Sequence, residues 1–153
     1  MGQAIKKNKV EYIDRVHGNS KGWITRSCID ENGYSQWHYK YLELKETDLT
    51  GENIYITLNT FYKPCRRLEC IKELNFVYID LDYYKTKYTK EQVIMNLESN
   101  YFNKIIPATN YIIDSGRGLA LLWNINKVPS QALPLWKAIQ EYLYHQLKEF
   151  GAD

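Results

Sequence analysis

Residues 76–82, Phe-Val-Tyr-Ile-Asp-Leu-Asp, constrain the fold most, because their side chains alternate between apolar and polar or aromatic types. A strand places successive side chains on opposite faces. One face would then be aliphatic and would pack against helices: it carries Val77, Ile79 and Leu81. The opposite face would end in Asp80 and Asp82. This segment therefore predicts a strand that is covered on one side and carries two carboxylates on the other.

The remaining segments supply elements that fit such a strand. Further strands are expected over residues 22–30, 34–44, 53–58, 110–114 and 119–123, with Asn32-Gly33 as a hairpin turn. Pro64 is expected to open a short helix with Leu68, Ile71 and Leu74 on one face. Thr89 begins a capping box for a helix to about residue 99. Ser130 caps a longer helix that stops at Gly151 and whose apolar face holds Leu135, Trp136, Ile139, Tyr142, Leu143 and Leu147.

These elements predict an α+β fold with helices on one face of a largely antiparallel sheet. The 153 residues favour a single domain, with a β-rich part over residues 1–58 and a core over 59–153. No apolar run approaches the ~20 residues of a membrane span, and no apolar stretch follows the N-terminus. We therefore expect a soluble, cytoplasmic protein without a membrane partner. Three cysteines without a Cys-x-x-Cys pair disfavour a disulfide framework and structural zinc.

Charge and aromatic content leave nucleic-acid binding open. The net charge is only +2, but residues 1–30 and 63–73 are locally basic. Aromatic residues make up 14% of the chain and are interleaved with lysines in residues 83–88. This interleaving is typical of surfaces that stack single-stranded nucleic acid, although ordinary core residues and solvated charges explain it as well.

Asp80 and Asp82 are a candidate metal site. Two like charges one pleat apart repel each other unless a cation lies between them. Mg²⁺ is commonly held by one or two carboxylates together with substrate phosphates. The alternative is a strand that ends in a solvated acidic turn.

Residues 114–118, Asp-Ser-Gly-Arg-Gly, are a candidate phosphate-binding turn between two apolar strands. Glycines let the backbone approach a ligand, and an arginine beside exposed N–H groups suits a phosphate. The segment is neither a P-loop nor a dinucleotide fingerprint, because no Gly-Lys-Ser/Thr follows and no helix begins there. An ordinary hairpin turn with an exposed arginine is the alternative.

Taken together, these motifs resemble the archaeo-eukaryotic primase superfamily. The resemblance rests on residues 79–82 (Ile-Asp-Leu-Asp), residues 114–119 (Asp-Ser-Gly-Arg-Gly-Leu) before a strand ending in Trp123, residues 58–61 (Leu-Asn-Thr-Phe) and Arg66-Arg67. It is strongest to the primase domains in replication proteins of plasmids, phages and integrative elements. It covers about residues 54–153.

The resemblance implies a two-metal DNA primase/polymerase-type nucleotidyltransferase, with a sheet like that of the RNA-recognition motif covered by helices. Asp80 and Asp82 would be catalytic and would bind Mg²⁺ or Mn²⁺. The nucleotide-binding turn would consist of Ser115, Gly116, Arg117 and Gly118. Phosphates of nucleotide or template would be contacted by Asn59, Arg66 and Arg67. The implied partners are nucleotide triphosphates, a single-stranded DNA template, and a helicase or C-terminal domain of a longer parent protein.

The chain departs from the family pattern in two places. Ala120 stands where many members carry a phosphate-binding histidine, and the third acidic residue of the family is expected beyond Asp153. The sequence thus predicts a truncated primase core, inactive by itself if that residue is needed. A catalytically silent single-stranded nucleic-acid or origin-binding module is the main alternative, and an unrelated α+β domain is a third. A rolling-circle relaxase is disfavoured because a His-x-His pair is absent.

Overall fold

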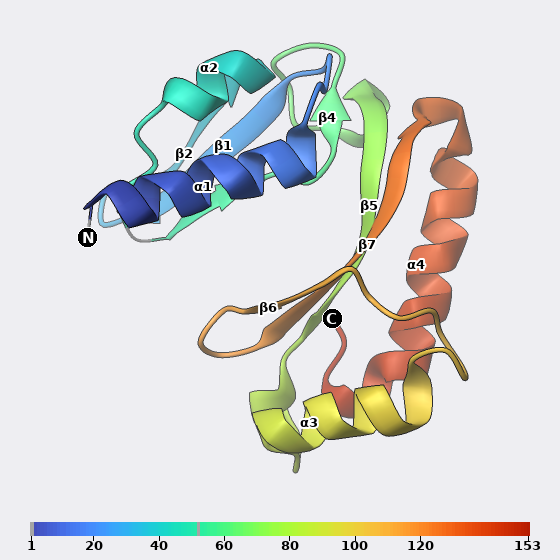
Figure 1. Cartoon of the computed structure of the whole chain (residues 1–153). Coiled ribbons are helices and arrows are strands. Elements are labelled where there is room, and N and C mark those ends of the chain that lie inside the picture. Colours follow the sequence, from blue (N-terminus) through green and yellow to red (C-terminus); the bar gives the residue numbers. More distant parts are fainter. Residues whose placement is uncertain (1, 52) are drawn as a thin grey trace. The chain divides into compact units, whose positions relative to one another are not determined.

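The computed structural model describes the backbone of residues 2–51 and 53–153 and the side chains of residues 9–51 and 53–153. The chain forms two compact units. One consists of Met1–Asn75 with Asn126–Ser130, and the other of Phe76–Ile125 with Gln131–Asp153. The predicted α+β class is confirmed, with one three-stranded and one four-stranded sheet (Figure 1). The likeness of the second sheet to an RNA-recognition motif stays a prediction.

The first unit packs two helices against a small antiparallel sheet. Its elements are α1 (Gly2–His17), β1 (Ile24–Asp30), β2 (Gly33–Tyr39), α2 (Tyr41–Glu46), β3 (Ile54–Ile56) and β4 (Thr60–Phe61). The strand order is β2-β1-β3, and both pairings are antiparallel. Ile13 of α1, Ile24 of β1 and Leu44 of α2 form its fully buried centre.

The N-terminal part, which was expected to be rich in strands, also contains two helices that the sequence did not predict. Residues 2–17 form a helix, because Ile13 and Val16 recur at helical spacing and are buried. The second strand ends at Tyr39 instead of residue 44, because α2 begins at Tyr41. The Glu43 side chain stabilises this helix start by accepting a hydrogen bond from the Lys40 N–H (3.1 Å). The predicted hairpin is confirmed, although its register makes Glu31-Asn32 the two-residue loop, with Asp30 opposite Gly33.

The second sheet has the order β4-β5-β7-β6, where β5 is Ile71–Leu81, β6 is Tyr111–Asp114 and β7 is Leu119–Pro129. The helix expected after Pro64 was wrong. Only a 3₁₀ turn forms, at Leu68–Cys70, and Ile71 and Leu74 belong to β5. The spacing of these apolar residues fits a helix locally, but pairing of Ile71 with Phe61 and of Glu73 with Thr60 stabilises a strand.

Two helices cover one face of the sheet in the second unit (Figure 1). They are α3 (Lys90–Asn96), continued by a π-helical turn at Leu97–Tyr101, and α4 (Leu133–Leu147), preceded by a 3₁₀ turn at Ser130–Ala132 and followed by another at Lys148–Phe150. The buried core joins Val77, Ile79 and Leu81 of β5 and Leu119, Leu121 and Trp123 of β7 with Val93, Leu97, Ile106, Leu143, Leu147 and Phe150. The predicted capping box is confirmed, since the Thr89 side chain accepts from Gln92 N–H and Gln92 Oε1 accepts from Thr89 N–H.

The face predicted for α4 is only partly buried. Leu143 and Leu147 are buried and Trp136 packs on the core, whereas Leu135 is 64% exposed. Ile139 and Tyr142 are exposed as well. At about 100° per residue these three residues lie beside the core-facing stripe and not on it. In the described part of the chain, no helix is both long and apolar enough to cross a membrane.

Candidate functional site

Beyond its short pairing with β4, strand β5 has one edge that is bounded by side chains of α4 instead of a further strand. The indole Nε1 of Trp136 donates to the Phe76 carbonyl (2.8 Å), and the Tyr78 N–H donates to Gln140 Oε1 (2.8 Å). Residues two apart in a strand direct their backbone groups to the same edge. Helix α4 thus satisfies the backbone of β5 up to the start of the acidic segment.

The C-terminal residues continue this edge along the acidic segment. The Asp82 N–H donates to the Gly151 carbonyl (2.9 Å), and the Asp153 N–H donates to the Asp80 carbonyl (3.0 Å). Leu81 and Ala152 form an antiparallel bridge between these two bonds. Asp153 therefore lies beside Asp80 and Asp82, whereas the resemblance predicts the third acidic residue of the family beyond Asp153.

The carboxylate of Asp80 is destabilised in its charged form. Its partial burial raises its pKa, and the negative charges of Asp82 and Asp153 raise it further. The negative charge of Asp82, by contrast, is paired with a cation, because the ammonium of Lys85 lies 2.7 Å from its Oδ2. Among the described residues, no group of three or more His, Cys, Asp or Glu side chains is arranged to hold a metal ion. Asp80 and Asp82 thus form a pair with a third negative charge nearby.

The turn after β6 lies directly against Leu81 and Asp82 at the end of the acidic segment. A Cβ atom built on Gly118 would be 2.6 Å from the Leu81 carbonyl oxygen and 3.5 Å from Asp82 Oδ1. Only glycine allows this approach without displacing the backbone. The structure therefore brings together the acidic segment and the glycine turn, which are more than thirty residues apart in the sequence.

The turn uses most of its own backbone donors. Ser115 N–H donates to the Gly118 carbonyl (3.0 Å), Gly118 N–H donates to the Ser115 hydroxyl (3.1 Å), and Gly116 N–H donates to Asp114 Oδ1 (2.8 Å). These groups are not available to cradle a phosphate while the turn keeps this form. The exposed side chain of Arg117 is the group of the turn best suited to an anion.

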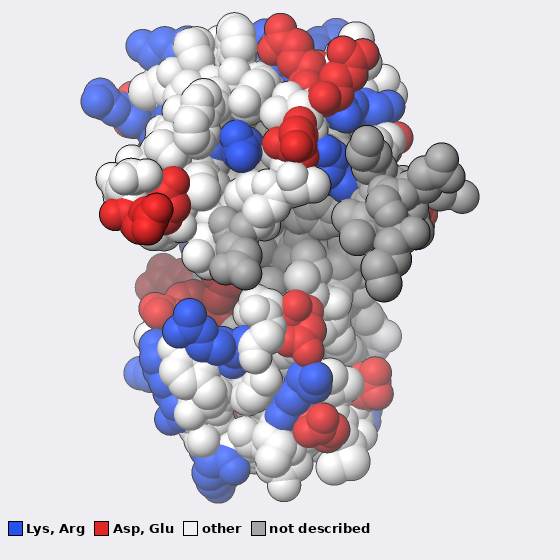
Figure 2. Space-filling model, turned by 90° about the vertical axis from the view of Figure 1, so that its left-hand side faces the viewer, with Lys and Arg blue, Asp and Glu red and all other residues white. Residues whose placement is uncertain are grey.

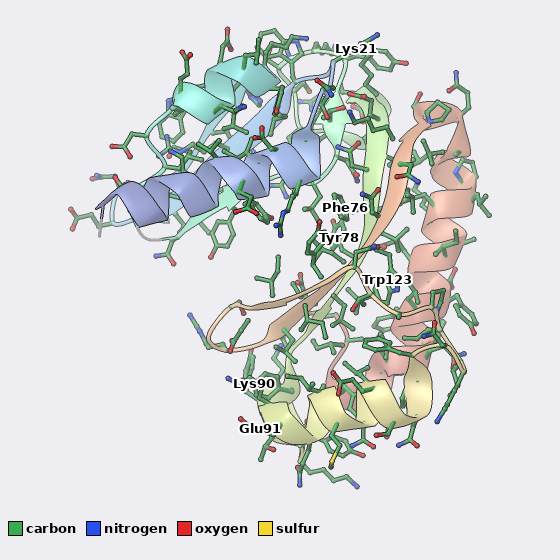
Figure 3. All side chains as sticks on the ribbon, viewed as in Figure 1. Lys21, Phe76, Tyr78, Lys90, Glu91 and Trp123 are labelled. Atoms are coloured by element: carbon green, nitrogen blue, oxygen red, sulfur yellow. The ribbon has the colours of Figure 1, made fainter. Side chains whose placement is uncertain are left out.

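A second lysine stands at the start of α3, where Figure 3 labels Lys90. Its ammonium lies 2.9 Å from Asp114 Oδ2, and this cation lowers the pKa of Asp114. Ala120 lies on the sheet face opposite the helices, because its neighbours Leu119 and Leu121 are in the core. Asp80 shares that face, since Ile79 and Leu81 are in the same core. Ala120 thus supplies no charged group to the face that carries Asp80.

The other predicted phosphate-binding residues belong to the first unit. Asn59 is 9% exposed, and its Oδ1 accepts from the Asn75 N–H (2.9 Å). Arg66 donates to the hydroxyl of Tyr34 (3.1 Å), and Arg67 lies 3.9 Å from Glu69. The roles of these three residues in phosphate binding stay predictions.

Several residues that pair with the predicted site residues were not identified from the sequence. Lys85 follows Asp82 by three residues and lies on the 3₁₀ turn Tyr83–Lys85, a spacing that could have predicted their ion pair. No local signal linked Arg66 to Tyr34 or Lys90 to Asp114. On the face drawn in Figure 2, lysines and arginines are interspersed with acidic residues.

Comparison with known proteins gives one informative relative. A protein of Clostridium perfringens named "Replication protein" is 72% identical to this chain over all 153 residues. The chain spans 38% of the length of that protein. No protein-family model matches the chain, and neither does any solved structure.

Proposed function

We propose that this chain is part of the primase/polymerase-type nucleotidyltransferase core with which a longer replication protein polymerises nucleotides on single-stranded DNA. One observation carries the proposal. The glycine turn, with Gly118 against Asp82, and the C-terminal residues, with Asp153 against Asp80, converge on the acidic end of β5. The similarity to a protein named for replication supports the same conclusion.

The donor set suits a hard divalent cation. Asp80 and Asp82 offer carboxylate oxygens, and the raised pKa of Asp80 reflects a surplus of negative charge that a cation would relieve. We therefore assign Mg²⁺ or Mn²⁺ to these two residues. Bound there, the ion would supply positive charge to the phosphates of a nucleotide.

The chain's own basic residues would orient the nucleotide. Arg117 is exposed on the turn beside Asp82, and its guanidinium can bind a phosphate through two parallel hydrogen bonds. The ammonium of Lys85 is bound to Asp82. When a metal ion takes its place at Asp82, the Lys85 side chain can bind a phosphate of the nucleotide instead. Ser115 and Gly118 fix the turn so that Arg117 keeps its position.

A catalytically silent module that binds single-stranded nucleic acid is the second candidate. Specific observations favour it. Lys85 neutralises Asp82 without a metal, three backbone N–H groups of the turn are already used, and Ala120 offers no charge. Both candidates place the chain in replication, and they differ in whether the acidic pair acts in chemistry.

Calorimetric titration with Mn²⁺, with and without a nucleotide triphosphate, separates the two candidates. We expect binding by the natural chain, tighter binding with nucleotide, and loss of both in Asp80→Asn/Asp82→Asn. Asp30→Asn/Glu31→Gln is the matched control, because it also neutralises two carboxylates close together in the chain. Identical isotherms for the natural chain and Asp80→Asn/Asp82→Asn would refute the metal site.

Incorporation of labelled nucleotides on a single-stranded template tests the activity itself. The assay compares this chain with a complete replication protein of the kind it matches, each with Mn²⁺. We expect Asp80→Asn to abolish incorporation by the complete protein and the Asp30 and Glu31 control to retain it. Incorporation that survives Asp80→Asn would favour the silent module for this part of the protein.

A further inference from the structure

The three-stranded sheet of the first unit has two chemically different faces. Ile24, Tyr39 and Ile56 lie on one face, where they pack with Ile13 of α1 and Leu44 of α2. In an antiparallel sheet, residues opposite each other across a pair of strands share a face. The register of β1 with β2 and β3 therefore identifies the residues of the other face.

We call this other face the tyrosine face. It consists of Thr25, Ser27 and Ile29 of β1, Tyr34, Gln36 and His38 of β2, and Tyr55 of β3. Side-chain contacts agree with the register, since the Thr25 hydroxyl lies 2.9 Å from His38 Nδ1 and Gln36 contacts the Tyr34 hydroxyl. Two of its aromatic side chains are largely exposed, Tyr34 by 53% and Tyr55 by 55%.

An arginine from the loop after β4 reaches this face. Arg66 Nη1 donates to the hydroxyl of Tyr34 at 3.1 Å, and Gln36 Nε2 donates to the same oxygen. The two donors tie the exposed ring to its neighbours, so less of its rotational freedom remains to be lost when a ligand binds. They also bring a guanidinium to the edge of the face.

The charge of the tyrosine face favours an anionic ligand. None of its seven residues is acidic, and the arginine at its edge is exposed. Tyr34 lies opposite Ile29 and Tyr55 opposite Ser27, so the two tyrosines are two strands apart and offset by two residues. Strand spacing and rise place their Cα atoms about 12 Å apart. This separation is much larger than the spacing of about 3.4 Å between stacked bases. The two rings can therefore each stack on a different base of the strand.

We propose that the tyrosine face binds single-stranded DNA, with one base stacked on Tyr34, another on Tyr55, and Arg66 on the backbone phosphates. Exposed rings stack on any base, and a guanidinium at the edge of the platform neutralises the strand. A protein ligand is less well matched, because the face combines hydroxyl and amide groups with separated rings instead of a continuous apolar surface. The choice of single-stranded DNA as the ligand rests on the proposed function, and the inference adds where on the chain this DNA binds.

Fluorescence anisotropy of a labelled oligothymidylate, measured without metal or nucleotide, tests the proposal. We expect Tyr34→Leu and Tyr55→Leu each to weaken binding by roughly five- to a hundredfold, the range that follows from the loss of one stacked base. Tyr55→Phe keeps the ring and should bind within about twofold of the natural chain, because stacking does not need the hydroxyl. Tyr142→Leu is the matched control, since Tyr142 is a 47% exposed tyrosine in the other unit.

Salt dependence separates the role of Arg66 from that of the rings. Arg66→Ala should reduce the slope of log affinity against log salt by roughly 0.7, the value for one phosphate contact on a single strand. Tyr55→Leu should lower affinity without changing this slope. A duplex of the same sequence should bind more weakly, because its bases are already stacked.

Several results would overturn the proposal. They are unchanged affinity in both leucine variants at native circular dichroism, an equal loss in Tyr142→Leu, or equal binding of duplex and single strand. Asp80→Asn/Asp82→Asn should bind the oligonucleotide normally in this metal-free assay. Failure of the tyrosine face and failure of the metal site are therefore read from different variants.

Discussion

His17 makes the stability of the first unit sensitive to pH. It lies at the C-terminal end of α1 and is completely buried. Its Nε2 is 2.6 Å from the Thr57 carbonyl oxygen, and its Nδ1 is 3.4 Å from the amide nitrogen of Asn75. A carbonyl can only accept and an amide nitrogen can only donate. These contacts therefore assign the neutral ring with its proton on Nε2.

Protonation of His17 would place a second N–H against the Asn75 amide donor in a buried site. Burial accordingly lowers the pKa of His17 to about 4 from its usual 6.5. Between these values the unfolded chain binds a proton that the folded chain does not bind. Stability is thus complete above pH 6.5 and falls as the pH is lowered toward 4, by about 3 kcal/mol in total and about 2 kcal/mol by pH 5.

Urea denaturation at pH 7 and pH 5 measures this loss. We expect His17→Gln to be less stable than the natural chain at pH 7, and to lose about 2 kcal/mol less between the two pH values because it cannot titrate. His145→Gln, which removes an exposed histidine, should keep the full pH dependence of the natural chain. Equal losses in the natural chain and His17→Gln, or an NMR titration of His17 with a midpoint above pH 6, would refute the reasoning.

Three substitutions in the second unit test other contacts. Gly118→Ala should cost roughly 1–3 kcal/mol in urea denaturation, because its methyl group would lie 2.6 Å from a backbone oxygen of β5. Trp136→Phe should cost about 1–2 kcal/mol, since the buried Phe76 carbonyl loses its indole donor while most of the ring volume remains. Lys85→Met should tighten Mn²⁺ binding severalfold by removing the cation that competes for Asp82, and calorimetry that shows unchanged or weaker binding would contradict this.

Local patterns predicted the elements of the second unit well. Strict alternation over residues 76–82 identified the buried face of β5, and the Thr89 capping box identified the start of α3. Predictions failed where a local pattern competed with contacts distant in the sequence. Ile71 and Leu74 fit a helix by spacing, yet Ile71 pairs with Phe61 in the sheet. Helix α1 was missed because only a narrow stripe of it, including Ile13, is buried.

The candidate site could be predicted in its residue types but not in its assembly. Alternation placed Asp80 and Asp82 on one face, and the glycines predicted a close backbone approach at the turn. The sequence could not show that Gly118 approaches Asp82, since this contact depends on how β7 lies beside β5. It also could not show that the turn satisfies its own N–H groups, which moves the expected phosphate contact toward Arg117.

The C-terminal residues add negative charge near Asp80 because they lie along the edge of β5. A strand edge with unsatisfied backbone groups is open to further pairing, and here the tail after α4 covers it at Asp80 and Asp82. Gly151 makes this possible in two ways. Its φ of +83° ends the helical segment, and its missing side chain lets the chain pass where a Cβ would be 2.6 Å from the Asp82 carbonyl oxygen. The same turn therefore stops the helix, closes the edge and brings the negative charge of Asp153 beside Asp80, so the surplus of negative charge at Asp80 is a product of the fold.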